Sequence, residues 1–197
     1  MEYKMRNKEG SWYLREMCRD LRPILQKFEN PIIHEIGSYE GESAEIFAQE
    51  FPFAKIICID PWKSGYDDLD DTSHHDFNKV YYNFKERVSY LNNVIDFTGD
   101  YKTFIHSTNI LNGISKRFPK MVYIDGLHSY EGVKSDIELS LKVLKPGCII
   151  SGHDYQSDES ILKIHPHIRG VKKAVDEMLG QPDKTYKDGS WYKMILK

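Results

Sequence analysis

The stretch MVYIDGLHSYEGVKSDIELSLKVLKPGCIIS, residues 121–151, has the clearest structural pattern in the chain. Its two ends, 121–125 and 147–151, are short and almost continuously apolar, as are strands that are buried on both faces. Between them, apolar side chains recur at helical intervals, at Val133, Ile137, Leu141 and Leu144. A strand, a helix and a second strand in this order predict a parallel pair joined by a right-handed crossover.

Three more apolar runs of the same kind come earlier, at 31–36, 55–60 and 93–97, and a leading helix is expected within 1–30. A last helix near 170–179 is followed by TYKDGSWYKMIL, in which Asp188-Gly189 predicts a hairpin. The sequence therefore predicts an α/β fold. We expect a Rossmann-like, doubly wound, mostly parallel seven-stranded sheet with a C-terminal antiparallel hairpin.

The composition fits a single domain over residues 1–197. The chain has 27 Lys and Arg against 30 Asp and Glu, and this near balance argues against nucleic acid as a partner. No apolar run of about 18 residues is present, so we expect no membrane span. The N-terminus has no apolar signal region, and the three cysteines form no CxxC pair, so we expect a cytoplasmic protein without disulfides.

An acidic insertion at 61–79 is too long for a simple strand-to-helix connection. Because it follows the carboxyl end of a predicted strand, where such sheets bind ligands, we interpret it as a lid. Its charged residues could form a cation site or a surface for a basic acceptor: Asp67, Asp68, Asp70, Asp71, His74, His75 and Asp76. Adjacent like charges repel, which favours the simpler interpretation of a solvated loop.

A glycine-containing turn follows the first predicted strand in IIHEIGSYEGES, residues 32–43. Gly37 and Gly41 allow close approach of a ligand, and the helix that starts near Ser43 offers free N–H groups. An ordinary strand-to-helix turn is the alternative. Asp60 ends the next strand, 19 positions after Gly41, where a carboxylate can accept both ribose hydroxyls of an adenosine.

Ionisable side chains follow the last two parallel strands. Asp125 and His128 come after one strand, and His153 and Asp154 come after the next. Since parallel strands end at the same edge of the sheet, we expect these four groups to converge beside the glycine turn. Convergence of groups that lie far apart in sequence is typical of an active site.

These motifs resemble those of the class I S-adenosylmethionine-dependent methyltransferases, in the branch of small-molecule and sugar O-methyltransferases. The resemblance extends from about Pro31 to the C-terminal hairpin. It is carried by Glu35-x-Gly-x-x-x-Gly-x-Ser43, Ile59-Asp60-Pro-Trp62, Ile124-Asp-Gly-x-His-x-Tyr130 and Leu144-Lys-Pro-Gly-Cys-Ile-Ile-Ser-Gly-His-Asp-Tyr155.

The resemblance implies S-adenosylmethionine as cofactor and a small-molecule acceptor. The turn residues Gly37, Ser38, Tyr39 and Gly41, with Ser43, would hold the methionine part, and Glu35 would orient its ammonium group. Asp60 would take the ribose hydroxyls with Trp62 nearby, and Asp100 and Tyr101 would face the adenine. All these residues match the motifs or the predicted end of the third strand.

On the acceptor side, the resemblance implies Asp125 and His128 as catalytic residues, with His128 as general base. It implies Mg²⁺ or another divalent metal at Asp125 and Asp154, and His153 stands where an acidic residue is expected. Imidazole suits softer metals than Mg²⁺. Three alternatives stay open: His153 points away, it ligates a different metal, or no metal binds.

Two other function classes stay open. One is a non-catalytic nucleotide- or cofactor-binding module of the same fold, and the other is an NAD-dependent oxidoreductase. The absence of G-x-G-x-x-G and the terminal hairpin argue against the oxidoreductase. The sequence leaves the acceptor and homo-oligomer formation open, because neither depends on these motifs.

Overall fold

A computed structural model describes residues 8–107 and 118–196. The leading helix predicted within 1–30 is α1 (Lys8–Leu25), and residues 1–7 lie outside the described part. Its apolar side chains Leu14, Met17, Leu21 and Leu25 are buried. Because they recur at three- and four-residue intervals, they form one face that packs on the domain.

The sheet has seven strands, in the order β3-β2-β1-β4-β5-β7-β6. The strands are β1 (Ile32–Ile36), β2 (Lys55–Asp60), β3 (Val94–Thr98), β4 (Met121–Ile124), β5 (Ile149–Gly152), β6 (Lys184–Thr185) and β7 (Trp191–Met194). The first five are parallel, and β7 pairs antiparallel with both β5 and β6. The predicted fold class and terminal hairpin are confirmed.

One strand starts later than predicted. The apolar run begins at Gly147, but β5 begins at Ile149. Gly147 has φ 84°, and the Cys148 amide donates to the Lys145 carbonyl at 3.0 Å. The first two residues of the run therefore complete a turn before the strand.

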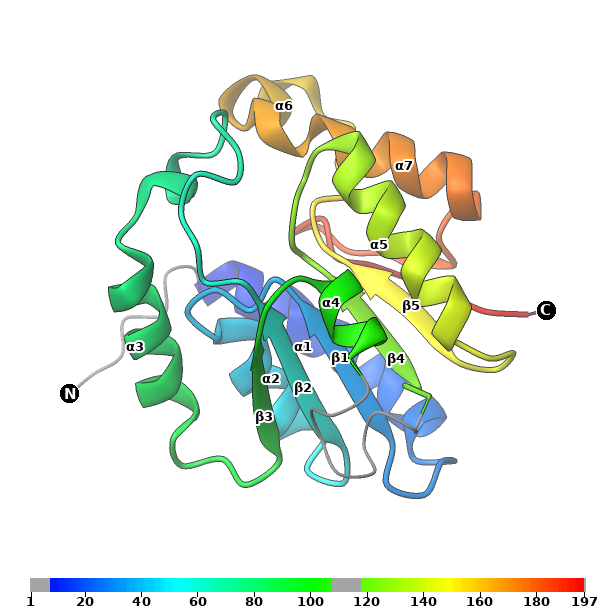
Figure 1. Ribbon diagram of the computed structural model, residues 1–197. Helices are drawn as coiled ribbons and strands as arrows, with labels where there is room; N and C mark the ends of the chain where they lie inside the picture. The colour runs from blue at the N-terminus through cyan, green and yellow to red at the C-terminus, as the bar shows by residue number, and fades with distance from the viewer. Residues whose placement is uncertain (1–7, 108–117, 197) are drawn as a thin grey trace.

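Helices cover both faces of the sheet (Figure 1). One face carries α1 with α2 (Glu42–Glu50) and α3 (Phe77–Val88), and the other carries α4 (Tyr101–His106), α5 (Tyr130–Val143) and α7 (Arg169–Leu179). Short elements complete the chain: α6 (Glu159–Ile164) and two 3₁₀ turns, η1 (Asp71–His74) and η2 (Pro166–Ile168). No helix in the described ranges is long and apolar enough to cross a bilayer.

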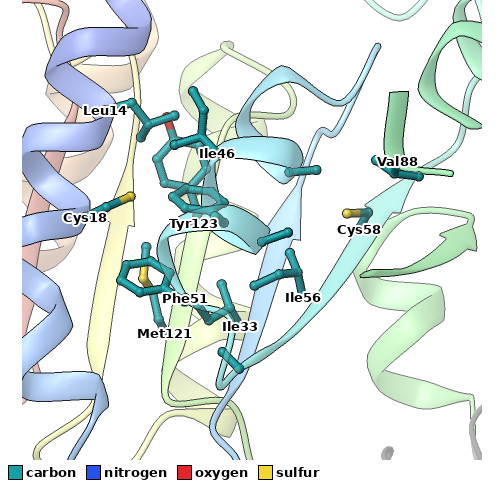
Figure 2. Close-up of a cluster of buried hydrophobic side chains, with 14 of the residues drawn as sticks. Leu14, Cys18, Ile33, Ile46, Phe51, Ile56, Cys58, Val88, Met121 and Tyr123 are labelled. Carbon is teal, nitrogen blue, oxygen red and sulfur yellow. The ribbon is translucent and has the colours of Figure 1, made fainter. Parts of the chain in front are cut away.

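The strands separate two apolar cores. Ile33, Ile56 and Cys58 face the α1–α2–α3 side (Figure 2). Ile32 and Ile57 belong to the core on the other side. Every residue of β1 is buried, which explains why these strands read as continuous apolar runs instead of alternating ones. All three cysteines are buried and free.

The strand order reverses at β1, which lies between β2 and β4. The chain leaves β1 toward α2 on one face and later enters α5 on the other, so a crevice opens at the carboxyl ends of β1 and β4. The Asp188-Gly189 turn supports the same edge, since the Tyr155 amide donates to the Gly189 carbonyl at 2.9 Å. The hairpin therefore holds the chain just after β5.

Candidate active site

A cavity of about 580 Å³ lies at this carboxyl edge. Its walls come from the turn after β1, the ends of β2 and β3, the loops after β4 and β5, and the insertion before α3. The site residues expected from the sequence that line it are Gly37, Ser38, Tyr39, Ser43, Asp60, Asp100, Tyr101, Asp125, His128, His153 and Asp154. Five chain segments that are far apart in sequence thus share one cavity.

The glycine turn after β1 has a left-handed backbone conformation that residues with a side chain rarely adopt. Gly37 has φ 84°, and a Cβ on it would lie 2.0 Å from the Asp125 carbonyl oxygen. Gly41 has φ 82° and immediately precedes α2, and its Cβ would meet the Phe84 ring at 2.8 Å. The first glycine lets the β1 and β4 loops touch, and the second lets α3 pack against the start of α2.

Glu35 is fully buried just behind the turn. Its Oε2 accepts a hydrogen bond from Ser38 Oγ at 2.5 Å, but its Oε1 has no hydrogen-bond partner among the described residues. Burial raises its pKa to about 7, against the lowering effect of the Ser38 hydroxyl. An unpaired buried oxygen next to the turn suits a cationic ligand group such as the ammonium of methionine.

Asp60 is held by backbone donors. Its Oδ2 accepts from the Tyr39 amide at 2.9 Å, and its Oδ1 accepts from the Trp62 amide at 2.6 Å. Burial raises its pKa, and these backbone hydrogen bonds oppose the rise. The carboxylate is therefore fixed in place while it still lines the cavity. The Trp62 ring packs against Tyr81 and Phe84, its Nε1 donates to the Tyr39 carbonyl at 2.9 Å, and Trp62 is not among the residues that line the cavity.

Carboxylates also lie at the end of the cavity beside β3. Asp100 caps α4 by accepting from the Thr103 amide at 2.6 Å, and it lines the cavity. Tyr101 is almost fully buried, and its hydroxyl lies 3.2 Å from His34 Nδ1. Asp136 on α5 also lines this end, and burial raises its pKa to about 7.

The four predicted ionisable groups do converge. His128 Nε2 lies 3.1 Å from Asp154 Oδ2 and 3.6 Å from Asp125 Oδ1. His153 Nδ1 lies 3.1 Å from Asp154 Oδ1 and 4.0 Å from Asp125 Oδ1. His153 therefore points toward the carboxylates, so the first of the three alternatives, that it points away, does not hold. Asp154 has φ 60°, a strained backbone conformation for a non-glycine residue that functional sites often hold.

The charges in this cluster stabilise one another. Burial alone would lower the pKa of both histidines, but hydrogen bonds and charge attraction from Asp154 and Asp125 raise each to about 10. The same histidines hold the pKa of the Asp154 carboxyl well below its usual range, against the effect of burial. In the absence of a metal ion, the cluster contains carboxylates and imidazolium groups at neutral pH.

The acidic insertion is shorter than expected. Asp76 caps α3 by accepting from the Asn78 amide at 3.1 Å, so α3 starts at Phe77 and the insertion ends at 76, not at 79. We call residues 61–76 the lid segment. The solvated interpretation is wrong for Asp70, which is 5% exposed and lines the cavity with Tyr66 and Thr72. Its carboxylate accepts hydrogen bonds from both residues, which compensates the cost of burial.

Two residues near the site, His167 and Asp136, were not predicted from the sequence, and a third, Asp70, was named only among several residues of a possible cation site in the insertion. Asp70 approaches His128 Nδ1 at 3.9 Å, and the His167 ring lies 5.4 Å from the His128 ring. The sequence motifs include neither His167 nor Asp136. A sequence signal existed for Asp136, since a carboxylate beside the apolar positions Val133 and Ile137 of a helix requires an explanation.

Residues 34–155, well over half of the chain, match a family model described as a methyltransferase domain. The fold is similar to that of the apo TDP-rhamnose 3′-O-methyltransferase of calicheamicin biosynthesis, with a TM-score of 0.61, 16% identity, and coverage of 95% of this chain and 81% of that one. It is also similar to an O-methyltransferase of Streptomyces achromogenes involved in tomaymycin synthesis, in complex with SAM. The TM-score is 0.61, the identity is 14%, and the match covers 96% of this chain and 80% of that one.

A third similar structure is an O-methyltransferase of Bacillus cereus in complex with SAH, with a TM-score of 0.56, 13% identity, and coverage of 99% of this chain and 94% of that one. At these identities the likeness to the solved structures shows the fold. The sequence has no significant match among curated proteins.

Proposed function

From the premise that this chain belongs to the methyltransferase domain family and is an S-adenosylmethionine-dependent methyltransferase, we propose that it methylates a hydroxyl group of a small molecule such as a sugar. One observation carries the proposal. A single cavity joins the Gly37 turn and Asp60 to Asp125, His128 and Asp154. A donor held by the first group would present its sulfur toward the second, because β1 and β4 end side by side.

The cofactor would lie along the first group of residues. Asp60 would accept hydrogen bonds from the ribose hydroxyls and Asp100 would face the adenine, and both line the cavity. Glu35 is buried behind the turn and does not line the cavity, and its unpaired Oε1 would attract the ammonium group from there. Bound S-adenosylmethionine supplies a methyl group on a positively charged sulfur, so its C–S bond breaks as the C–O bond to the acceptor forms. The chain then has to align the acceptor and remove its hydroxyl proton.

His128 would accept that proton at Nδ1. Its Nε2 faces Asp154 and Asp125, which would orient the ring as the acid of a catalytic triad orients its histidine. Its Nδ1 has no hydrogen-bond partner among the described residues. Since its pKa is about 10, the ring starts largely protonated at neutral pH, and the fraction able to accept a proton grows with pH.

A divalent metal ion is the second part of the proposal. The ligand atoms of Asp125, His128 and Asp154 lie within 4.8 Å of one another, so these residues fit a small ion. Two carboxylates with an imidazole suit a transition metal better than Mg²⁺. Such an ion would supply positive charge beside the acceptor oxygen and would replace the proton on His128 Nε2. His153 would then pair with Asp154 as a neighbour.

The acceptor would enter between the lid segment and His128. On that side the cavity presents the polar groups of Tyr66, Asp70 and Thr72. Hydroxyl and carboxylate groups in a partly enclosed cavity suit a ligand with several hydroxyls.

Calorimetric titration with S-adenosylhomocysteine and with NAD, followed by methyl transfer from labelled S-adenosylmethionine to a panel of sugars and phenols, tests the proposal. We expect S-adenosylhomocysteine to bind, NAD to fail, and at least one hydroxylated compound to be methylated. Binding without any turnover across the panel supports the non-catalytic module instead, and tight NAD binding supports the oxidoreductase. Repeating the assay with a chelator tests the metal.

A further inference from the structure

A second group of metal-ligating side chains lies on the opposite edge of His128 from the carboxylate pair. Asp70, His128 and His167 each offer one ligand atom, and these atoms lie within 4.8 Å of one another. The three residues come from the lid segment, the loop after β4 and η2. The lid segment and the α6–η2 region lie at the same end of the molecule, at the top of Figure 1.

His128 Nδ1 is the feature that points to a ligand. This nitrogen is buried and has no hydrogen-bond partner among the described residues, and Asp70 Oδ2 lies 3.9 Å away. That separation is too long for a hydrogen bond, and a buried ring nitrogen without a partner is costly. Meanwhile Nε2 faces Asp154 at 3.1 Å. A metal-ligating histidine in proteins almost always donates its other N–H to a carboxylate in this way.

Asp70 is held ready to act as a ligand. Its Oδ1 accepts from the Thr72 amide at 2.9 Å and from Thr72 Oγ1 at 2.7 Å. Its Oδ2, which faces His128, accepts from the Tyr66 hydroxyl at 3.0 Å and keeps a lone pair free. Ligating carboxylates are commonly fixed by outer hydrogen bonds of this kind.

We infer that Asp70 Oδ2, His128 Nδ1 and a ring nitrogen of His167 bind one divalent transition-metal ion. Metal bonds to nitrogen and oxygen of about 2.0–2.2 Å place two tetrahedral ligands roughly 3.4 Å apart. The gap between Asp70 and His128 has to close by only about half an ångström to reach that separation. Two imidazoles and one carboxylate select Zn²⁺, Co²⁺ or Ni²⁺ over Mg²⁺ and Ca²⁺.

The bound ion would connect the lid segment to the loop after β4 and to η2. It would also occupy the lone pair that we propose for proton acceptance, so an occupied site would slow methyl transfer. That consequence rests on the proposed function, whereas the binding itself does not. Metal binding is therefore measured on the full chain with neither cofactor nor acceptor present.

Titration with Co²⁺, followed by visible absorption, tests the inference. We expect Co²⁺ absorption bands that Zn²⁺ abolishes and that the loss of Asp70 or His167 weakens. A Co²⁺ ion held instead by Asp125, His128 and Asp154 would keep its bands in those variants. Changing an outer partner of a metal ligand costs 10–100-fold in affinity, so His167→Ala and Asp70→Asn, which remove direct ligands, should each weaken binding by about 100-fold or more. His74→Ala, which changes an exposed histidine of the lid segment that is none of the three ligands, is the matched control and should bind like the wild type.

Asp125→Asn separates this site from the carboxylate site. Asp125 does not ligate the inferred ion, so the variant should keep Co²⁺ binding within about 100-fold, the outer-partner range. Absence of Co²⁺ binding in the wild type overturns the inference, and so does a Co²⁺ affinity of His167→Ala equal to that of the wild type. Methyl transfer is assayed without Co²⁺, once with a chelator and once with Mg²⁺. Transfer by a chain that binds no Co²⁺ overturns this inference alone. No transfer under either condition by a chain that binds Co²⁺ overturns the proposed function alone. Thermal denaturation of each variant checks its folding.

Discussion

The two halves of the cavity are built differently. The half around Gly37 and Asp60 is shaped by backbone: a left-handed glycine in contact with the β4 loop, and a carboxylate held by two amides. The half around His128 is shaped by charged side chains from the lid segment and the loops after β4 and β5. The first half depends on chain geometry, and the second depends on protonation and bound cations.

This difference separates two kinds of sensitivity. Backbone contacts at the ends of strands leave no room for added atoms. Substitutions that add atoms to the first half should therefore impair folding and cofactor binding. Ionised pairs respond to pH and to competing cations, so the second half should change activity while the fold persists. The four predictions that follow test this separation, from the largest effect to the smallest.

Gly37→Ala should cause the largest loss. Its Cβ would lie 2.0 Å from the Asp125 carbonyl oxygen at φ 84°, so both the β1 turn and the β4 loop have to move. We expect a destabilisation of about 4 kcal/mol from overpacking together with the left-handed conformation, and loss of S-adenosylhomocysteine binding. Urea unfolding and calorimetry measure both.

Gly65→Ala is the matched control, since Gly65 also has a positive φ, 77°, but its Cβ would meet no atom within 4 Å. It should cost only about 1 kcal/mol. Equal losses in the two variants would show that the contact between the β1 and β4 loops is unimportant.

His128→Ala should lower the rate of methyl transfer by about 10²–10⁴-fold, the usual contribution of a general base. S-Adenosylhomocysteine affinity should stay within a few fold, because the cofactor residues lie in the other half. Single-turnover assays and calorimetry measure the two effects. His165→Ala supplies the control, and full activity of His128→Ala would remove the base from the proposal.

Asp60→Asn should weaken cofactor binding by about 10–100-fold, which corresponds to the loss of a hydrogen bond to a charged group. One amide oxygen cannot serve the Tyr39 and Trp62 amides together with the ribose hydroxyls. Asp68→Asn, an exposed change in the lid segment, should leave the affinity unaltered. Equal affinities for the two variants would place the ribose elsewhere.

The smallest effect is that of one pH unit, about 1.4 kcal/mol for a single titrating group. The pKa of His128 rises from the ordinary value of 6.5 to about 10 in the folded chain, so its pairs with Asp154 and Asp125 stabilise the protein fully below about pH 6.5. That stabilisation is lost as pH rises through about 10, while the base form and the rate increase. Unfolding free energies measured with a chelator over this range should fall, and Asp154→Asn should flatten the fall. A flat wild-type profile would contradict the charge pairing.

Much of the fold could be predicted because its strands are buried on both faces. The apolar runs of β1, β2 and β4 predicted strands of a parallel sheet, and Asp188-Gly189 predicted the hairpin. The convergence of Asp125, His128, His153 and Asp154 follows from the rule that parallel strands share a carboxyl edge.

The rest depends on contacts between segments, which periodicity does not encode. Asp70 belongs to an acidic run that favours exposure, yet Tyr66 and Thr72 bury it by satisfying its oxygens. The approach of His167 to His128 depends on how η2 packs over the β4 loop. Trp62 matches its motif, but a left-handed φ of 42° turns its ring toward α3.

A crystal structure of the chain with bound S-adenosylhomocysteine tests most directly whether the two halves form one site. We predict that its ribose contacts Asp60, its amino acid part follows the turn from Gly37 to Gly41, and its sulfur faces His128. A ligand bound elsewhere, or one whose sulfur points away from His128, would contradict the account.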